Sequence, residues 1–147
     1  MTESAHERIV VNAPTAMVYG VAIDFERYPA WAKDVKSASI LETDSEGRGL
    51  QVEYRAAALG RSIRYVLEYE YEEAPDAFTW RLQEGDMLRR LDGRYGFSAD
   101  GDNTKVTYDL AVELAVPLPG LIKRRASGLI MGSALRELKR ECEQESA

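Results

Sequence analysis

The chain has 147 residues, 45% of them hydrophobic, and a formal net charge of −6. This length predicts one domain over residues 1–147 that buries a core without disulfides. The acidic excess argues against a nucleic-acid partner, because such binding relies on Lys and Arg to neutralise phosphates. Cys142 is the sole cysteine, and the first residues lack the charged and apolar regions of a signal peptide. We therefore expect a cytoplasmic protein.

The hydrophobic period changes within residues 9–31. Residues 9–13 alternate as on a half-buried strand, whereas the apolar residues after them lie three or four positions apart on one helical stripe: Val18, Val21, Ala22 and Phe25. Pro14 marks the change, because its ring suits the first helical position and keeps Ala13 extended. The aromatic segment 24–31 predicts a second short helix, which we expect the Asp24 side chain to cap.

Turn residues punctuate the middle of the chain, from residue 36 to residue 116. Gly, Pro, Asp and Asn gather near positions 45–47, 59–60, 75–76, 84–86 and 100–103. The segments between them alternate like strands and leave no room for crossover helices, so they predict an antiparallel meander. Strands of about a dozen residues reach roughly 40 Å and twist, so we expect a curved sheet with a concave apolar face.

The last segment predicts one long helix from Gly120 to Glu143. Its apolar residues lie near one stripe: Ile122, Ala126, Leu129, Ile130, Ala134, Leu138 and Cys142. Such a helix is roughly 36 Å long and matches the strands. The predicted fold is therefore α+β, with a curved antiparallel sheet of about seven strands wrapped around a long C-terminal helix, and two short helices after the first strand.

Four short motifs carry a family resemblance. They are N-A-P at 12–14, V-Y at 18–19, D-F-E-R-Y-P-A-W at 24–31 and V-P-L-P-G-L-I-K-R-R at 116–125. With them the chain resembles the START-like (SRPBCC, helix-grip) superfamily, and within it the bacterial polyketide cyclase/dehydrase and coenzyme-Q-binding-like branch. The resemblance spans nearly the whole chain and implies the helix-grip fold. It does not select a function, because that scaffold serves lipid carriers, cyclases, hormone receptors and plain ligand binders.

Aromatic residues with polar tips alternate in register with apolar neighbours on the predicted inner face. We expect a ligand cavity there, between sheet and helix, with these residues in contact with the ligand: Tyr54, Ala56, Tyr65, Tyr69, Trp80, Arg89, Tyr95 and Leu129. Small side chains such as Ala56 and Ala58 leave volume unfilled. The alternative is an ordinary aromatic core whose polar tips reach backbone, water or the rim.

Arg89 interrupts an apolar set that alternates inward from Met87 to Phe97. A buried guanidinium requires an anion or several acceptors, so Arg89 could meet a ligand carboxylate, enolate or quinone oxygen. The other interpretation is that Arg89 lies near a strand end, where it reaches solvent or pairs with Glu84 or Asp86.

Other chemistry finds little support in the sequence. His6, the sole histidine, is expected to face outward, and inward carboxylates do not cluster, so we predict neither a metal site, a cofactor nor a nucleophilic triad. Lys123, Arg124 and Arg125 fit a solvated helix start, with transient contact to an acidic membrane surface as the alternative.

The leading functional hypothesis is binding or carriage of a small hydrophobic ligand that is aromatic, quinone-like or a lipid. The second is a polyketide aromatase/cyclase or dehydrase acting in the same cavity, where Arg89 with Tyr65 or Tyr95 would polarise carbonyls. The third is a closed pocket in a protein that works through partner contacts. Ligand identity, oligomeric state and pathway do not follow from the sequence.

Overall fold

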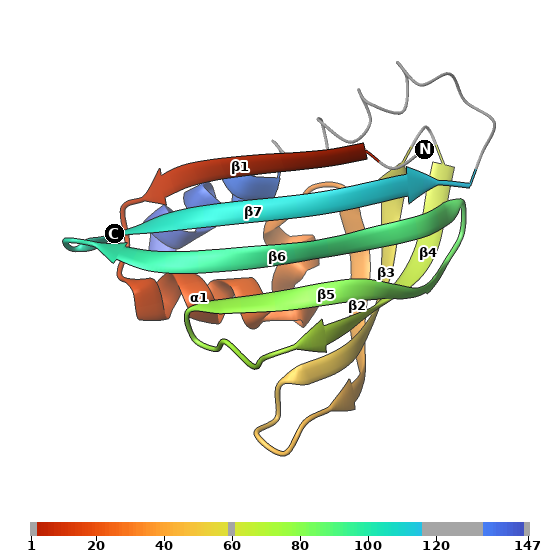
Figure 1. Cartoon of the computed structure of the whole chain (residues 1–147), viewed down its shortest axis with the longest axis horizontal. Helices are drawn as coiled ribbons and strands as arrows, with labels where there is room; N and C mark the ends of the chain where they lie inside the picture. The colour runs from red at the N-terminus through yellow and green to blue at the C-terminus, as the bar shows by residue number, and fades with distance from the viewer. Residues whose placement is uncertain (1–2, 59–60, 116–133, 146–147) are drawn as a thin grey trace.

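The computed structural model describes residues 3–58, 61–115 and 134–145. Its elements in chain order are β1 (Glu3–Val11), α1 (Thr15–Ile23), the 3-10 turn η1 (Phe25–Arg27), α2 (Tyr28–Trp31), β2 (Val35–Thr43), β3 (Gly49–Ala58), β4 (Arg61–Glu70), β5 (Ala77–Gly85), β6 (Leu88–Asp100) and β7 (Asn103–Leu114). Residues 134–145 form a C-terminal helical segment. The seven strands make one antiparallel sheet in the order β1-β7-β6-β5-β4-β3-β2 (Figure 1). The predicted α+β architecture is confirmed.

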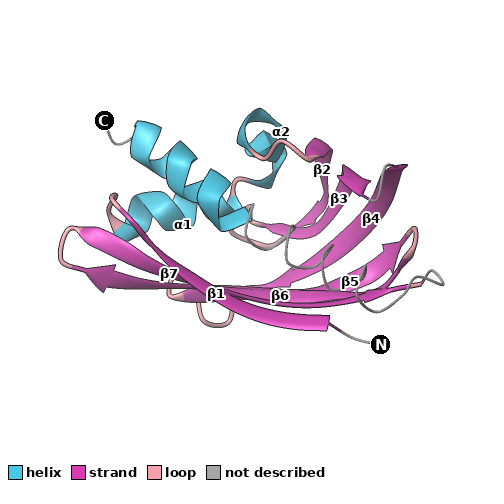
Figure 2. Cartoon of the chain, turned by 90° about the horizontal axis from the view of Figure 1, so that it is seen from above, coloured by secondary structure: helices cyan, strands magenta, loops and turns pink. Residues whose placement is uncertain are grey.

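The sheet is curved, and the helices lie on its concave side (Figure 2). The C-terminal helical segment packs there through Leu138 and Cys142, which are both 0% exposed, as the predicted stripe requires. The stripe residues Ile122, Ala126, Leu129 and Ile130 lie outside the described residues. The core therefore lies between the concave face and the helices.

The change from strand to helix occurs at Pro14, as predicted. Pro14 is the N-cap residue of α1, however, and not its first helical residue. Pro14 is extended, with φ −64° and ψ 150°, and α1 begins at Thr15. Val18, Ala22 and Phe25 are buried, as the helical stripe predicts, and Val21 is half-buried.

The prediction for Asp24 is wrong, because its side chain makes no capping hydrogen bond. Its backbone ψ of 70° departs from the extended conformation of a typical N-cap residue. Instead, the Asp24 carbonyl oxygen accepts a hydrogen bond from the Arg27 amide at 3.1 Å.

Glycine makes two of the predicted hairpin turns. Gly47 and Gly101 have φ of 83° and 62°, a left-handed conformation that costs glycine little. The Asp44 side chain supports the first turn by accepting hydrogen bonds from the amides of Glu46, at 2.9 Å, and Arg48, at 2.8 Å. The turn predicted at residues 59–60 lies outside the described residues.

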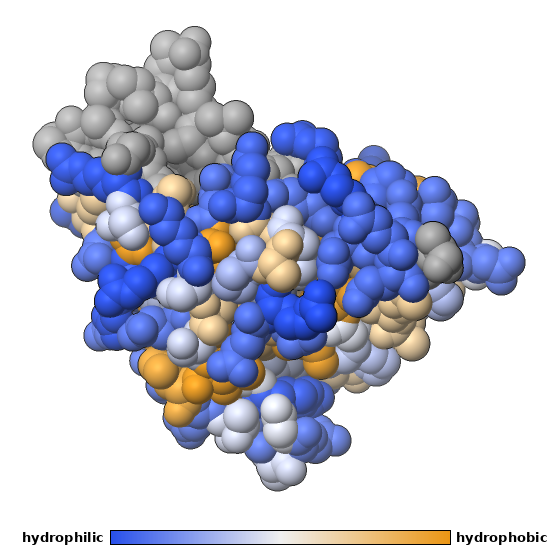
Figure 3. Space-filling model, turned by 180° about the vertical axis from the view of Figure 1, so that it is seen from behind, coloured by the Kyte–Doolittle hydropathy of each residue, from blue (hydrophilic) through white to orange (hydrophobic). Residues whose placement is uncertain are grey.

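The surface on the helix side is mainly hydrophilic, with hydrophobic residues in smaller patches (Figure 3). His6 is exposed beside Asp109, as its outward register predicts. Across the described ranges, no helix combines the length and apolar character needed to span a membrane.

Candidate functional site

A cavity of about 420 Å³ lies against the concave face of the sheet. Residues of α2, strands β2 to β7 and the C-terminal helical segment line it. Most of these residues are hydrophobic or aromatic, and the volume falls within the usual range of small-molecule sites. The cavity can therefore hold a compact apolar molecule.

Cross-strand pairing brings six aromatic side chains to the cavity. Tyr54 lies opposite Tyr65, Tyr69 opposite Trp80, and Tyr95 opposite Tyr108. Directly opposed residues in an antiparallel pair share one face of the sheet, so each pair points the same way. The rings of Tyr54 and Tyr65 stack at 5.3 Å, and those of Tyr95 and Tyr108 lie 4.7 Å apart.

Most of the predicted ligand contacts line this cavity. They are Tyr54, Ala56, Tyr65, Tyr69, Trp80 and Tyr95. Tyr28 and Trp31 of the aromatic turn also line it, while Phe25 lies fully buried against the Tyr69 ring at 4.2 Å. Leu129 and the side chain of Ala58 lie outside what the structure describes.

The tyrosine hydroxyls divide into two groups. Tyr54 and Tyr69 share a hydrogen bond of 2.7 Å, and Tyr28 and Tyr71 donate to the carbonyl oxygens of Ala22 and Gly49. The second group makes no hydrogen bond to a described residue: Tyr19, whose hydroxyl is fully buried, and the cavity residues Tyr65, Tyr95 and Tyr108. A ligand in the cavity can accept hydrogen bonds from the last three hydroxyls.

Burial raises the pKa of the cavity tyrosines. The pKa of Tyr65 rises to about 12, and those of Tyr95 and Tyr108 also lie above the usual value. Desolvation is the largest cause in each case, because an apolar site disfavours the charged phenolate. At neutral pH these hydroxyls are therefore uncharged donors.

Glu137 is a cavity residue that the sequence reasoning missed. It is 8% exposed, lines the cavity from the C-terminal helical segment, and accepts a hydrogen bond from the Lys33 amide at 2.8 Å. The sequence did contain an indication of this position, because Glu137 directly precedes Leu138 and lies three residues after Ala134, next to the apolar stripe. A carboxyl group thus faces a largely apolar space.

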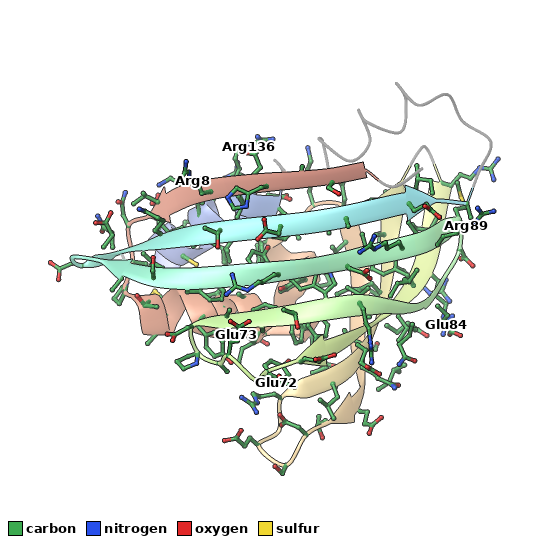
Figure 4. All side chains as sticks on the ribbon, viewed as in Figure 1. Arg8, Glu72, Glu73, Glu84, Arg89 and Arg136 are labelled. Carbon is green, nitrogen blue, oxygen red and sulfur yellow. The ribbon has the colours of Figure 1, made fainter. Side chains whose placement is uncertain are left out.

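Arg89 does not line the cavity, so the prediction that it points inward is wrong. A register shift between Leu88 and Arg90 interrupts the pairing of β6 with β7. Because this bulge adds one residue, Leu88 and Leu91 both reach the cavity while Arg89 is exposed. Figure 4 shows Arg89 at the end of the sheet where β6 begins, which agrees with the alternative placement near a strand end.

In the described part of the chain, no group of three His, Cys, Asp or Glu side chains is arranged to hold a metal ion. The described lining of the site offers an apolar wall, uncharged hydroxyl donors and the carboxyl groups of Asp34 and Glu137.

Solved structures resemble the whole fold. A START superfamily protein from Mycobacterium smegmatis is 26% identical, with a TM-score of 0.90 over 96% of this chain and 97% of that one. A Thermus thermophilus protein is 23% identical, with a TM-score of 0.83 over 99% and 100% of the two chains. The Zhui aromatase/cyclase from a Streptomyces species is 14% identical, with a TM-score of 0.87 over 100% and 97%. At such identities the last two show the fold alone.

No curated protein is similar enough to this sequence to count as a relative. The model of one protein family, described as polyketide cyclase/dehydrase and lipid transport, matches residues 2–143. That match covers nearly the whole chain, including every described strand and most of the C-terminal helical segment. The chain belongs to the polyketide cyclase/dehydrase and lipid transport family, within the START-like superfamily.

Proposed function

We propose that the protein binds and carries a small hydrophobic ligand, aromatic, quinone-like or lipid, in the cavity between sheet and C-terminal helical segment. The observation that carries this proposal is an apolar cavity of about 420 Å³ with hydroxyl donors along its wall. Tyr65, Tyr95 and Tyr108 would orient ligand oxygens while the apolar wall holds the rest. We also propose that the chain acts as one domain in the cytoplasm.

The protonation of these donors favours carriage over catalysis. General acid-base catalysis near neutral pH needs a group whose pKa lies close to 7. The raised pKa values of the cavity tyrosines move them away from that range. Such groups can hold a carbonyl oxygen in place but exchange protons poorly.

Native mass spectrometry of freshly purified protein, followed by titration with a naphthoquinone and a fluorescent fatty acid, tests the proposal. We expect a retained ligand, or saturable binding of at least one probe. Protein without a retained ligand that also binds neither probe would favour the closed-pocket hypothesis.

Glu137 supports a second candidate, the aromatase/cyclase or dehydrase. Its carboxyl group lines the cavity, where it could accept a proton from a polyketone chain while tyrosine hydroxyls polarise carbonyls. The Zhui structure supports the same candidate through its fold alone. Arg89, which the sequence reasoning placed in this role, lies outside the cavity.

Incubation with a reactive poly-β-ketone distinguishes carrier from enzyme. Cyclised product that disappears in Glu137→Gln but persists in Arg89→Ala would establish the enzyme and overturn the carrier. The carrier hypothesis predicts no product above the spontaneous background with any of the three proteins.

Gly93 provides a test of the cavity that needs no known reaction. A Cβ atom at this position would lie 2.2 Å from Trp80 Cζ2 and 2.8 Å from the Asp109 carbonyl oxygen. Gly93→Ala should therefore push the Trp80 indole toward the cavity, weaken probe binding and lower the free energy of unfolding by about 1–3 kcal/mol. Titration and urea unfolding measure both effects.

Gly20→Ala is the matched control. Gly20 lies within α1, and a Cβ atom there would have no neighbour within 4 Å. Alanine should stabilise this helix by about 0.5–1 kcal/mol and leave binding unchanged. If Gly93→Ala and Gly20→Ala bind the probes equally tightly, Trp80 does not line the ligand site.

A further inference from the structure

The cavity reaches the surface at one end of the sheet. At this end β3 stops at Ala58, β4 begins at Arg61, and the start of β2 lies beside them. Asp34 and Ala57 line the cavity here and are both exposed, so the cavity opens between these strand ends and the helices. We refer to this end of the sheet as the entrance end.

Positive side chains gather on three neighbouring strands at the entrance end. Lys36 lies in the register shift at the start of β2, and the next residue of β2 pairs with Arg55 of β3. Arg61 begins β4, and Lys33 precedes β2 by two residues. All four side chains are exposed, and none forms an ion pair with another described residue. We name this surface the basic corner.

Arg64 engages several negative groups beside the basic corner. It forms ion pairs with Glu53 at 2.7 Å and Glu84 at 2.9 Å, and its amide donates to the Asp86 carboxylate at 3.0 Å. Asp34, at the cavity opening, is outnumbered by the four cations of the basic corner. The basic corner is therefore locally positive in a chain whose formal net charge is −6.

The charge of Arg55 does not stabilise the sheet. Arg55 lies directly opposite Arg64 in the pairing of β3 with β4. Like charges in such a pair repel each other, and the carboxylates of Glu53 and Glu84 already pair with Arg64. The Arg55 guanidinium is thus available to a partner outside the chain.

The opposite end of the same three strands is acidic. Glu42, Glu68, Glu70 and Glu72 line a groove across β2, β3 and β4 there. Figure 4 shows Glu72 away from Arg89, which lies at the entrance end. An anionic surface would repel the acidic end and attract the basic corner, so this polarity orients the molecule with its cavity opening toward such a surface.

The residues around the opening favour a bilayer over an acidic protein as the partner. Trp31, Val35 and Met87 line the cavity at this end and are half-buried. An anionic bilayer offers headgroup phosphates to the basic corner and an apolar interior to these side chains. An acidic protein surface matches only the charges.

We propose that the entrance end docks, through the basic corner, on a lipid bilayer that contains anionic lipids. The four cations lie outside the cavity lining, so this role does not depend on which ligand the cavity holds. Lys123, Arg124 and Arg125 lie outside the described residues and are not part of the proposed surface.

Sedimentation of the full chain with lipid vesicles tests the docking. Vesicles of about 30% phosphatidylserine in phosphatidylcholine supply the anionic surface, and vesicles of phosphatidylcholine alone are the uncharged reference. At low ionic strength we expect at least about tenfold stronger partitioning onto the anionic vesicles. The difference should shrink as salt rises toward about 0.5 M, because salt screens exposed charges.

Charge reversal tests the basic corner itself. Arg55→Glu combined with Arg61→Glu should weaken partitioning onto the anionic vesicles by at least about tenfold. The matched control combines Arg8→Glu with Arg136→Glu, which changes the net charge equally at two exposed positions away from the entrance end (Figure 4). This control should stay within about threefold of the parent. Circular dichroism and probe titration should show that both double variants fold and bind probes like the parent.

Three results would overturn the docking, and none of them bears on ligand binding in the cavity. The first is equal partitioning onto anionic and uncharged vesicles, or onto neither. The second is an equal loss in both double variants, which would show a dependence on net charge alone. The third is retention on immobilised polyglutamate without binding to anionic vesicles, which would assign the basic corner to an acidic protein partner.

Discussion

Leu138→Ala should lower the free energy of unfolding by about 2–5 kcal/mol. Leu138 is 0% exposed in the C-terminal helical segment and belongs to the hydrophobic core that this segment shares with the sheet. Truncation removes buried methyl groups and leaves a cavity that rigid strands cannot close completely. Urea unfolding followed by circular dichroism measures the change.

Leu41→Ala is the control, since Leu41 is 52% exposed on β2 and its truncation opens no internal space. We expect a change within about 0.5 kcal/mol for this variant. A loss below about 1 kcal/mol in Leu138→Ala would mean that the sheet does not depend on the helical segment for its core.

Alkaline pH should unfold the protein through its buried tyrosines. Burial raises the pKa of Tyr65 to about 12 and raises those of Tyr54, Tyr69 and Tyr95 as well, whereas an unfolded tyrosine ionises near pH 10. Above about pH 10 the unfolded chain therefore binds fewer protons than the folded one, and stability falls as pH rises. Tyr65 alone should contribute roughly 2–3 kcal/mol to this loss by about pH 12.

Urea midpoints at a series of pH values, recorded with the tyrosinate absorbance, measure this loss. Below about pH 10 the stability should not change with tyrosine ionisation, because neither state has lost the phenolic proton. Tyr65→Phe should make the alkaline decline shallower. Tyrosinate absorbance that rises fully near pH 10 in protein that stays folded would contradict the burial of these hydroxyls.

The elements of the fold were predictable because their signals are local. At Pro14 the hydrophobic pattern changes from alternation to a helical stripe, which indicates a strand followed by a helix. Turn residues between alternating segments indicate the antiparallel meander. Neither signal depends on distant residues. The same alternation placed Tyr54, Tyr65, Tyr69, Trp80 and Tyr95 on one face, and all five line the cavity.

The two wrong predictions, for Arg89 and Asp24, concern positions where the backbone geometry of a single residue decides what its side chain can contact. Alternation counted Arg89 as inward, but the bulge between Leu88 and Arg90 shifts the face of the strand by one position. Asp24 has the residue type of a helix cap, yet its ψ of 70° departs from the geometry that capping requires. Neither feature has a signal in the residue pattern.

The sequence by itself determined the α+β class, the order of elements and the aromatic face, because hydrophobic period and turn chemistry act over a few residues. Only the tertiary structure decided that about 420 Å³ of space remains between that face and the helices. It also decided which hydroxyls are already paired and that Glu137 faces the cavity. Volume and hydrogen-bond pairing depend on how distant segments approach one another, and no local pattern records that distance.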